Sequence, residues 1–121
     1  MKSNAINWFE IPSTNFDRAV KFYNELLETE LQPMEMDFKM AFFPYESGGV
    51  GGCVTHGNGN KPSQEGTFAY LNGGEDLAIP LARVEKAGGK IIMPKTSIGE
   101  NGYMAVFLDT EGNRVAFHSM K

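Results

Sequence analysis

Few side chains in this sequence could carry acid–base or nucleophilic chemistry, and they lie far apart. The one cysteine, Cys53, has no histidine or basic residue directly beside it, although folding could bring His118 close. Without a cause for a lowered thiol pKa, Cys53 is better explained as a small buried hydrophobe than as a nucleophile. His56 lies where a linker begins, so we expect it to be exposed rather than catalytic.

Length and composition limit the classes of function that the chain can have. A chain of 121 residues predicts one domain that buries about two thirds of its unfolded surface. The net charge of −4 is spread without a basic stripe, which argues against a nucleic-acid partner. No apolar run is long enough to cross a membrane, and a strand pattern follows the first residues where a signal peptide would have an apolar core. With a single cysteine, this predicts a cytoplasmic protein without a membrane partner.

The last part of the chain shows which elements must position these side chains. Residues 103–108 and 114–118 alternate between apolar and other residues and are joined by the turn formers of residues 109–113, which predicts a β-hairpin. A weaker copy lies upstream, where Lys39-Met-Ala-Phe-Phe43 matches Tyr103-Met-Ala-Val-Phe107. Because each copy follows a helical segment, the chain is expected to contain one small module twice.

Each module is predicted to be a strand, a helix and three more strands. In the first module (5–56) we expect strands at 6–11, 31–36, 38–44 and 50–55 and a helix at 15–27. Glycine in the fourth of these strands indicates either the close approach of a neighbouring backbone or ligand or, as we expect, a bulge. A linker at 57–66 leads to the second module (67–119), with strands at 67–72 and 90–93, a helix from about residue 76 to 87, a loop at 94–102 and the final hairpin. The predicted fold class is therefore α+β, with two tandem βαβββ modules in a single domain, 1–121.

Three stretches of this pattern resemble a known family. They are Trp8-x-Glu10-Ile-Pro followed by Asp17-Arg-Ala-x-x-Phe-Tyr23, then Leu81-Ala-Arg-Val-Glu-x-Ala-Gly-Gly89, and last Phe107-x-Asp109-x-Glu111-Gly112-Asn113-Arg. Together they resemble the vicinal oxygen chelate superfamily of glyoxalases, bleomycin resistance proteins and extradiol dioxygenases. The resemblance implies curled mixed sheets around a cavity, in which the metal enzymes of the family bind a divalent ion.

The metal ligands of that family come from the first and last strand of each module. Carried over to this sequence, the four positions hold Trp8, Cys53, Phe68 and Ala116, with about one residue of uncertainty in register. Three of these side chains cannot bind a metal, and a divalent ion in an oxygen-rich site needs several hard ligands. We therefore expect no metal site and no cofactor.

Two polar residues lie close to these positions and are candidate catalytic groups. Because strand side chains alternate, Glu10 shares a face with Trp8, and His118 shares a face with Ala116. They could act as polar anchors, or as an acid and a base, in an apolar pocket. The alternative is a displaced divalent metal site built on the same two residues. A strand-end carboxylate and a histidine near a frayed C-terminus would explain them equally simply.

The remaining candidates would bind a ligand. They are placed on the concave side of the sheets by simple hairpin registers: Trp8, Phe42, Cys53, Phe68, Tyr70 and Met104. Such residues at strand spacing commonly form core, but the cavity that the resemblance implies must be lined by something. This predicts a glyoxalase-like or bleomycin-resistance-like protein that binds a small organic molecule in an aromatic cleft. The alternative is a lyase, isomerase or dioxygenase, with or without metal, that uses Glu10 and His118.

The resemblance also implies pairing of chains. Each module has one helix to cover its sheet, which leaves strand edges exposed, and exposed edges recruit partners. The first strand of each module, with residues 7–9 and 67–70, is the candidate edge. We expect a homodimer, because a two-fold axis uses one patch twice and closes the assembly.

Overall fold

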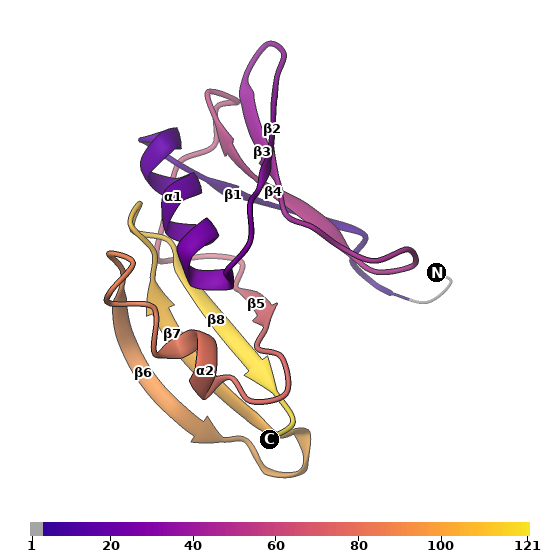
Figure 1. The fold of residues 1–121 in the computed structure, drawn as a ribbon, viewed down its shortest axis with the longest axis vertical. Coiled ribbons are helices and arrows are strands. Elements are labelled where there is room, and N and C mark those ends of the chain that lie inside the picture. Colours follow the sequence, from indigo (N-terminus) through magenta and orange to yellow (C-terminus); the bar gives the residue numbers. More distant parts are fainter. Residues whose placement is uncertain (1–3) are drawn as a thin grey trace.

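In the computed structural model, which describes residues 4–121, the chain forms two four-stranded sheets with the same strand order (Figure 1). The N-terminal sheet has the order β1-β4-β3-β2 and the C-terminal sheet the order β5-β8-β7-β6. In each, the first strand is parallel to the last, and the other pairs are antiparallel. The expected α+β fold with a doubled βαβββ order is therefore confirmed.

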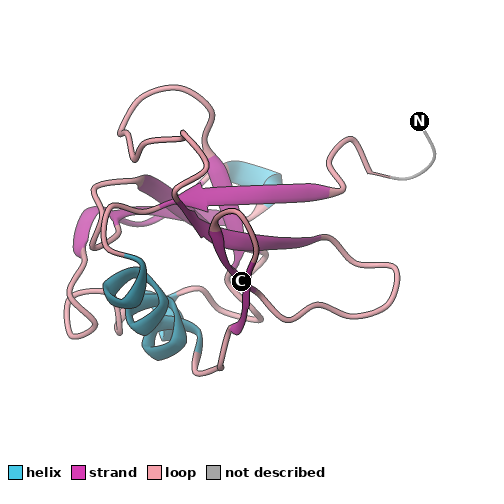
Figure 2. Cartoon of the chain, turned by 90° about the horizontal axis from the view of Figure 1, so that it is seen from above, coloured by secondary structure: helices cyan, strands magenta, loops and turns pink. Residues whose placement is uncertain are grey.

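The strands of the N-terminal sheet are β1 (Trp8–Pro12), β2 (Gln32–Glu35), β3 (Lys39–Phe42) and β4 (Gly51–His56). Those of the C-terminal sheet are β5 (Ala69–Asn72), β6 (Lys90–Ser97), β7 (Tyr103–Leu108) and β8 (Arg114–Ser119). The helices are α1 (Phe16–Leu27), α2 (Ala78–Leu81) and the single 3₁₀ turn η1 (Gly99–Asn101). Figure 2 shows the longer helix, α1, running beside the strands.

Two elements of the second module differ from the sequence expectation. The helix expected from residue 76 to 87 is regular only over α2. The chain then continues as turns in which an N–H donates to the carbonyl three residues earlier, as from Arg83 to Pro80 and from Val84 to Leu81. The strand expected at 90–93 extends through Pro94 to Ser97. Proline is tolerated there because β6 is an edge strand, with shifts in register between Ile91 and Thr96.

The bulge expected in the strand at 50–55 is also absent. β4 pairs with both neighbours in an unbroken register. Its glycines instead make room for aromatic rings: a Cβ on Gly52 would lie 2.4 Å from the ring of Phe9, and one on Gly51 would lie 2.6 Å from the ring of Tyr45. Close approach of neighbouring side chains, rather than an extra residue, therefore explains glycine inside this strand.

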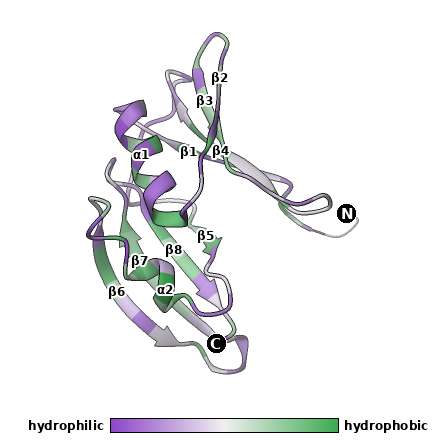
Figure 3. Cartoon of the chain, in the orientation of Figure 1, coloured by the Kyte–Doolittle hydropathy of each residue, from purple (hydrophilic) through white to green (hydrophobic). Residues whose placement is uncertain are grey.

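The core lies where α1 meets both modules. The amphipathic face of α1 buries Ala19, Phe22, Tyr23 and Leu26. The ring of Phe22 lies 6.1 Å from that of Phe107 in β7, so the helix of the first module packs on the sheet of the second. Figure 3 shows hydrophobic residues along β7 and much of β8, while α1 carries both kinds. One cluster of buried side chains thus joins the modules.

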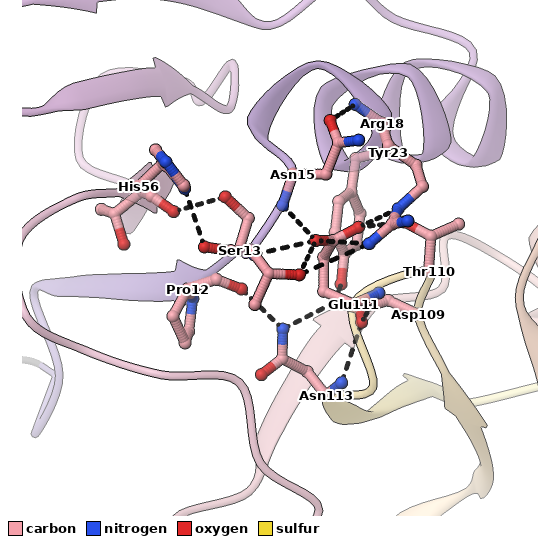
Figure 4. A network of polar contacts seen from close by, with 12 residues as sticks. Pro12, Ser13, Asn15, Arg18, Tyr23, His56, Asp109, Thr110, Glu111 and Asn113 are labelled. Atoms are coloured by element: carbon pink, nitrogen blue, oxygen red, sulfur yellow. Dashed lines mark hydrogen bonds and ion pairs between the residues drawn. The ribbon is translucent and has the colours of Figure 1, made fainter.

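The turn between β7 and β8 adds a polar connection to this core (Figure 4). The hairpin closes as expected, with Gly112 at φ +88° and the Asp109 N–H donating to Asn113 O. The buried Asp109 carboxylate then accepts a hydrogen bond of 2.7 Å from the hydroxyl of Tyr23 in α1. Asn113 donates its amide to Asp109 and to the carbonyl of Pro12 at the end of β1. The turn therefore holds the first module as well as its own hairpin.

Glu111 makes the second part of this connection, at the N-terminus of α1. Its Oε1 accepts from the backbone N–H groups of Thr14 and Asn15, at 2.9 and 2.7 Å, and its Oε2 pairs with Arg18 at 2.7 Å. Burial alone raises the pKa of Glu111, but the hydrogen bonds from Arg18, Asn15, Thr14 and Thr110 outweigh it and lower the pKa to about 2. A carboxylate from one module thus binds the backbone N–H groups of the N-cap and the residue before it in the other, at the positive end of the helix dipole.

The Glu111→Gln substitution should destabilise the protein by on the order of 2–3 kcal/mol at neutral pH, since it removes the charge from a buried set of hydrogen bonds. A depressed folded-state pKa stabilises above the unfolded value near 4.5, and this stabilisation is lost as the pH falls toward 2. The difference between wild type and variant in chemical unfolding should therefore shrink over that range. Glu100→Gln, at an exposed glutamate, is the matched control and should change little. A difference that stays constant from pH 7 to pH 2 would contradict this account.

Candidate functional site

One face of the N-terminal sheet points away from the core and collects half of the candidate residues. The strand registers place Trp8 opposite Gly51, Glu10 opposite Cys53, and Cys53 opposite Phe42. We call the surface formed by Trp8, Glu10, Phe42 and Cys53 the N-terminal face. The rings of Trp8 and Phe42 meet edge to face at 5.8 Å, and Trp8 remains 40% exposed. Two large aromatic side chains thus stand on either side of small residues of β4.

The cysteine of the N-terminal face, Cys53, is not activated for chemistry. Burial raises the pKa of the Cys53 thiol to about 11, and the nearby Glu10 carboxylate adds to the shift. The thiol is therefore protonated at neutral pH and is a poor nucleophile. Two residues further along β4, the Thr55 hydroxyl is buried and has no hydrogen-bond partner among residues 4–121. That oxygen is the one buried side-chain polar atom in this part of the chain left unpaired, and such atoms call for a polar partner.

The corresponding face of the C-terminal sheet carries the other half of the candidate residues. Tyr70 lies opposite Ala116 and Met104 opposite His118, and Phe68 precedes β5 on the same side as Tyr70. We call the surface formed by Phe68, Tyr70, Met104, Ala116 and His118 the C-terminal face. The rings of Phe68 and Tyr70 are 5.0 Å apart, the Tyr70 hydroxyl lies 3.9 Å from the Met104 sulfur, and Tyr70 is 50% exposed. This surface repeats the pattern of the first: exposed aromatic rings around a small residue.

Glu10 and His118, the candidate catalytic pair, are not brought together in the chain. Glu10 accepts a long hydrogen bond of 3.4 Å from Asn58, and His118 Nε2 donates to the carbonyl of Asn101 at 2.7 Å. No hydrogen bond or ion pair among residues 4–121 joins the two. His56 is half-buried and donates from Nδ1 to the carbonyl of Ser13, so it holds the end of β1. An acid–base mechanism within one chain therefore has no geometric support.

A cavity of about 770 Å³ lies between the modules, next to the C-terminal face. Its walls are the outer edge of β5, including Phe68 and Tyr70, together with Phe9, Phe43 and the C-terminal end of α1 around Leu27. A volume of this size suits a small organic molecule. Trp8, Phe42, Cys53 and Met104 do not line it, so the candidate ligand-binding residues divide between two surfaces.

Two residues beside these surfaces were not among the candidates predicted from the sequence. Tyr45 lies against Gly51 next to Trp8 and is 58% exposed. Arg114 begins β8, and its guanidinium carbon lies 4.7 Å from the ring centroid of Phe68. Tyr45 could have been identified as an aromatic residue just before a glycine-rich turn. Arg114 could have been identified from the alternation along β8, which puts residue 114 on the face of Ala116.

The donor set at the four positions where the resemblance implies a metal does not fit one. Trp8, Phe68 and Ala116 offer no lone pair for a divalent ion, and the Cys53 thiol is protonated. Among residues 4–121 no three histidine, cysteine, aspartate or glutamate side chains gather in a group that could hold a metal. We derive no chemistry through a metal.

Comparison with protein families gives one extended match. A family model described as the Glyoxalase/Bleomycin resistance protein/Dioxygenase superfamily matches residues 5–117. The comparison with curated proteins returned no match. Within residues 4–121 there is also no helix with the length and apolar character needed to span a membrane.

Solved structures share the fold at low sequence identity. A glyoxalase/bleomycin resistance protein from Albidiferax ferrireducens T118 superposes with a TM-score of 0.77 at 16% identity over 98% of this chain and 100% of its own. Glyoxalase I from Leishmania major gives 0.69 at 20% identity over 98% and 88%. A glyoxalase I mutant from Zea mays gives 0.73 at 18% identity over 93% of this chain, which spans only 44% of the maize protein. These likenesses concern the fold.

The purified protein is expected to contain no stoichiometric metal, because the side chains at the four positions cannot supply the ligands. Elemental analysis after expression in medium supplemented with nickel, zinc, iron and manganese measures this directly. One tightly bound ion per chain would show that the protein uses ligands other than those four. Repeating the analysis on Glu10→Gln and His118→Gln would then identify a displaced site.

Proposed function

Because the chain belongs to the glyoxalase/bleomycin resistance protein/dioxygenase superfamily, with a family model covering residues 5–117, we propose that it binds a small organic molecule in an aromatic cleft without a metal. The cleft is formed by the N-terminal and C-terminal faces, where Trp8, Phe42, Phe68 and Tyr70 provide the apolar contact area. Glu10 and His118 supply polar groups at its margins. Binding, rather than catalysis, is the function that these residues support best.

The exposed aromatic pairs carry this proposal. Trp8 and Tyr70 are 40% and 50% exposed, yet each lies against a second ring, Phe42 or Phe68, at the spacing of a preformed aromatic contact. Exposed aromatic surface of this kind is commonly a binding site, since it gains free energy when a partner covers it. The unpaired hydroxyl of Thr55 adds a polar group beneath the N-terminal face.

We also propose that a second copy of the chain completes the cleft. The two faces lie on different sheets, and no contact among residues 4–121 joins their aromatic pairs. The first strands of the two modules, β1 and β5, are edge strands with one side free of strand partners, and the 770 Å³ cavity runs along β5. A two-fold arrangement that sets β1 of one copy beside β5 of the other brings the N-terminal face of one to the C-terminal face of the other.

Binding in this cleft should be visible through Trp8, the only tryptophan in the sequence. In a thermal-shift screen of small aromatic compounds, any compound that raises the melting temperature should also change Trp8 emission, with or without divalent ions. Phe42→Ala should weaken such a compound about tenfold or more, because it removes a wall of the N-terminal face. Ile79→Ala, at an exposed position in α2, is the control and should leave affinity unchanged. Stabilising compounds that leave Trp8 emission unaltered would place binding elsewhere.

Light scattering at high micromolar concentration should give twice the chain mass of 13.4 kDa. Ile6 lies just before the edge strand β1 and is 56% exposed, so Ile6→Asp should place a charge beside the proposed contact and shift the protein toward monomer. Ile79→Asp again serves as control and should remain dimeric. A monomer mass for the wild-type protein would mean that any cleft is built from one chain.

A further inference from the structure

Arg114 is a cation with unused hydrogen-bond donors on the C-terminal face. Its guanidinium carbon lies over the ring of Phe68, 4.7 Å from the centroid, where cation–π attraction holds the cation near the ring. The side chain is exposed, and among residues 4–121 the three ion pairs use Arg18, Arg83 and Lys95 instead. Within the described part of the chain, the one hydrogen bond of Arg114 outside the strand ladder joins its backbone N–H to Ser63 O. All the guanidinium donors are therefore free for an acceptor.

The surroundings of Arg114 combine this cation with a flat apolar wall. The rings of Phe68 and Tyr70 lie 5.0 Å apart with their planes tilted by 58°, and both line the cavity of about 770 Å³. Between Arg114 and His118 on the same face, β8 presents the small side chain of Ala116, opposite Tyr70. A ring placed on Ala116 can contact Tyr70 while a substituent reaches Arg114, two residues along the strand.

Charge also favours an anion here. On β5, β7 and β8 the strand positions of this face hold Phe68, Tyr70, Asn72, Met104, Val106, Leu108, Arg114, Ala116 and His118, and none of them is a carboxylate. The edge strand β6 adds Lys90, opposite Leu108, in the same row as Arg114. The protein as a whole has a net charge of −4, so these two cations are not part of a general basic surface. An arginine fixed on an aromatic ring is suited to bidentate contact with a planar or tetrahedral acid group.

We propose that the ligand is an aromatic anion, whose acid group is bound by Arg114 while its ring packs against Tyr70 and Phe68. This names the chemical class of the ligand and rests on the proposed function. Arg114 then selects acids over neutral molecules of the same shape. A carboxylate and a sulfonate offer the same acceptor chemistry to the guanidinium, so either serves as a probe.

The test compares two fluorescent probes with similar ring systems. Anilinonaphthalene sulfonate carries an acid group, and phenylnaphthylamine lacks it. The wild-type protein should bind the sulfonate more tightly, and Arg114→Gln should weaken that binding about tenfold or more while leaving phenylnaphthylamine unchanged, because one charge-assisted pair is lost. The sulfonate affinity of Arg114→Lys should fall between those of the wild type and Arg114→Gln, since lysine keeps the charge and loses the planar guanidinium. Lys86→Gln, which removes one exposed positive charge elsewhere, is the matched control.

Unchanged sulfonate affinity in Arg114→Gln overturns the proposal. So does an equal loss for both probes, because Arg114 would then act only by supporting Phe68. A wild-type protein that binds phenylnaphthylamine as tightly as the sulfonate keeps the aromatic cleft of the proposed function and rejects the preference for an acid. If neither probe binds, both the cleft and the preference are wrong. Melting curves of every variant, measured alongside, establish that each is folded under the conditions of the titration.

Discussion

The carboxylates of Asp109 and Glu111 set the arrangement on which the rest of the molecule depends. Both belong to the tight turn between β7 and β8, and both bind groups of the other module: the Tyr23 hydroxyl for Asp109, and the N–H groups of Thr14 and Asn15, just before α1, for Glu111. Burying charge is costly unless donors surround it, and here helix N–H groups, a hydroxyl and Arg18 provide them. The apolar cluster around Phe22 joins the modules without defining a direction, whereas these bonds fix where α1 lies.

Much of the fold was readable from local patterns because those patterns coincide with the elements that tertiary packing uses. The alternation around the turn at 109–113 predicted the β7–β8 hairpin, and the apolar spacing from Phe16 to Leu27 predicted the helix at 15–27 that the structure has as α1. The second helix could not be read in the same way, since its buried stripe of Leu77, Leu81 and Val84 is satisfied equally well by tight turns. Gly51 and Gly52 were misread because the rings that fill their space come from outside β4.

Within the candidate site, the sequence predicted only which residues of one strand share a face. A period of two residues determined that Glu10 shares a face with Trp8, and His118 with Ala116, and the registers agree. Whether two such faces meet depends on how whole modules pack, which no spacing in the sequence encodes. Asp109 and Glu111 illustrate the same limit, because a turn motif looks local until its partners across the chain are known. The contact between Arg114 and Phe68 joins the start of β8 to the residue before β5, which only the parallel pairing of those strands brings together.

The bonds from Glu111 to Thr14 and Asn15 also affect how the chain folds during synthesis. Glu111 is 97 positions from Thr14 and 96 from Asn15 in the sequence, so these hydrogen bonds close a loop that spans most of the chain. When the first module leaves the ribosome, the N–H groups of Thr14 and Asn15, just before α1, still lack their acceptor, and the hydroxyl of Tyr23 has no partner until Asp109 follows. The last hairpin therefore completes the start of the first helix, and contacts of such long range slow folding. Interruption of synthesis before residue 109 leaves an N-terminal module whose polar connections from Pro12, Tyr23 and the start of α1 are all open and whose apolar side is uncovered.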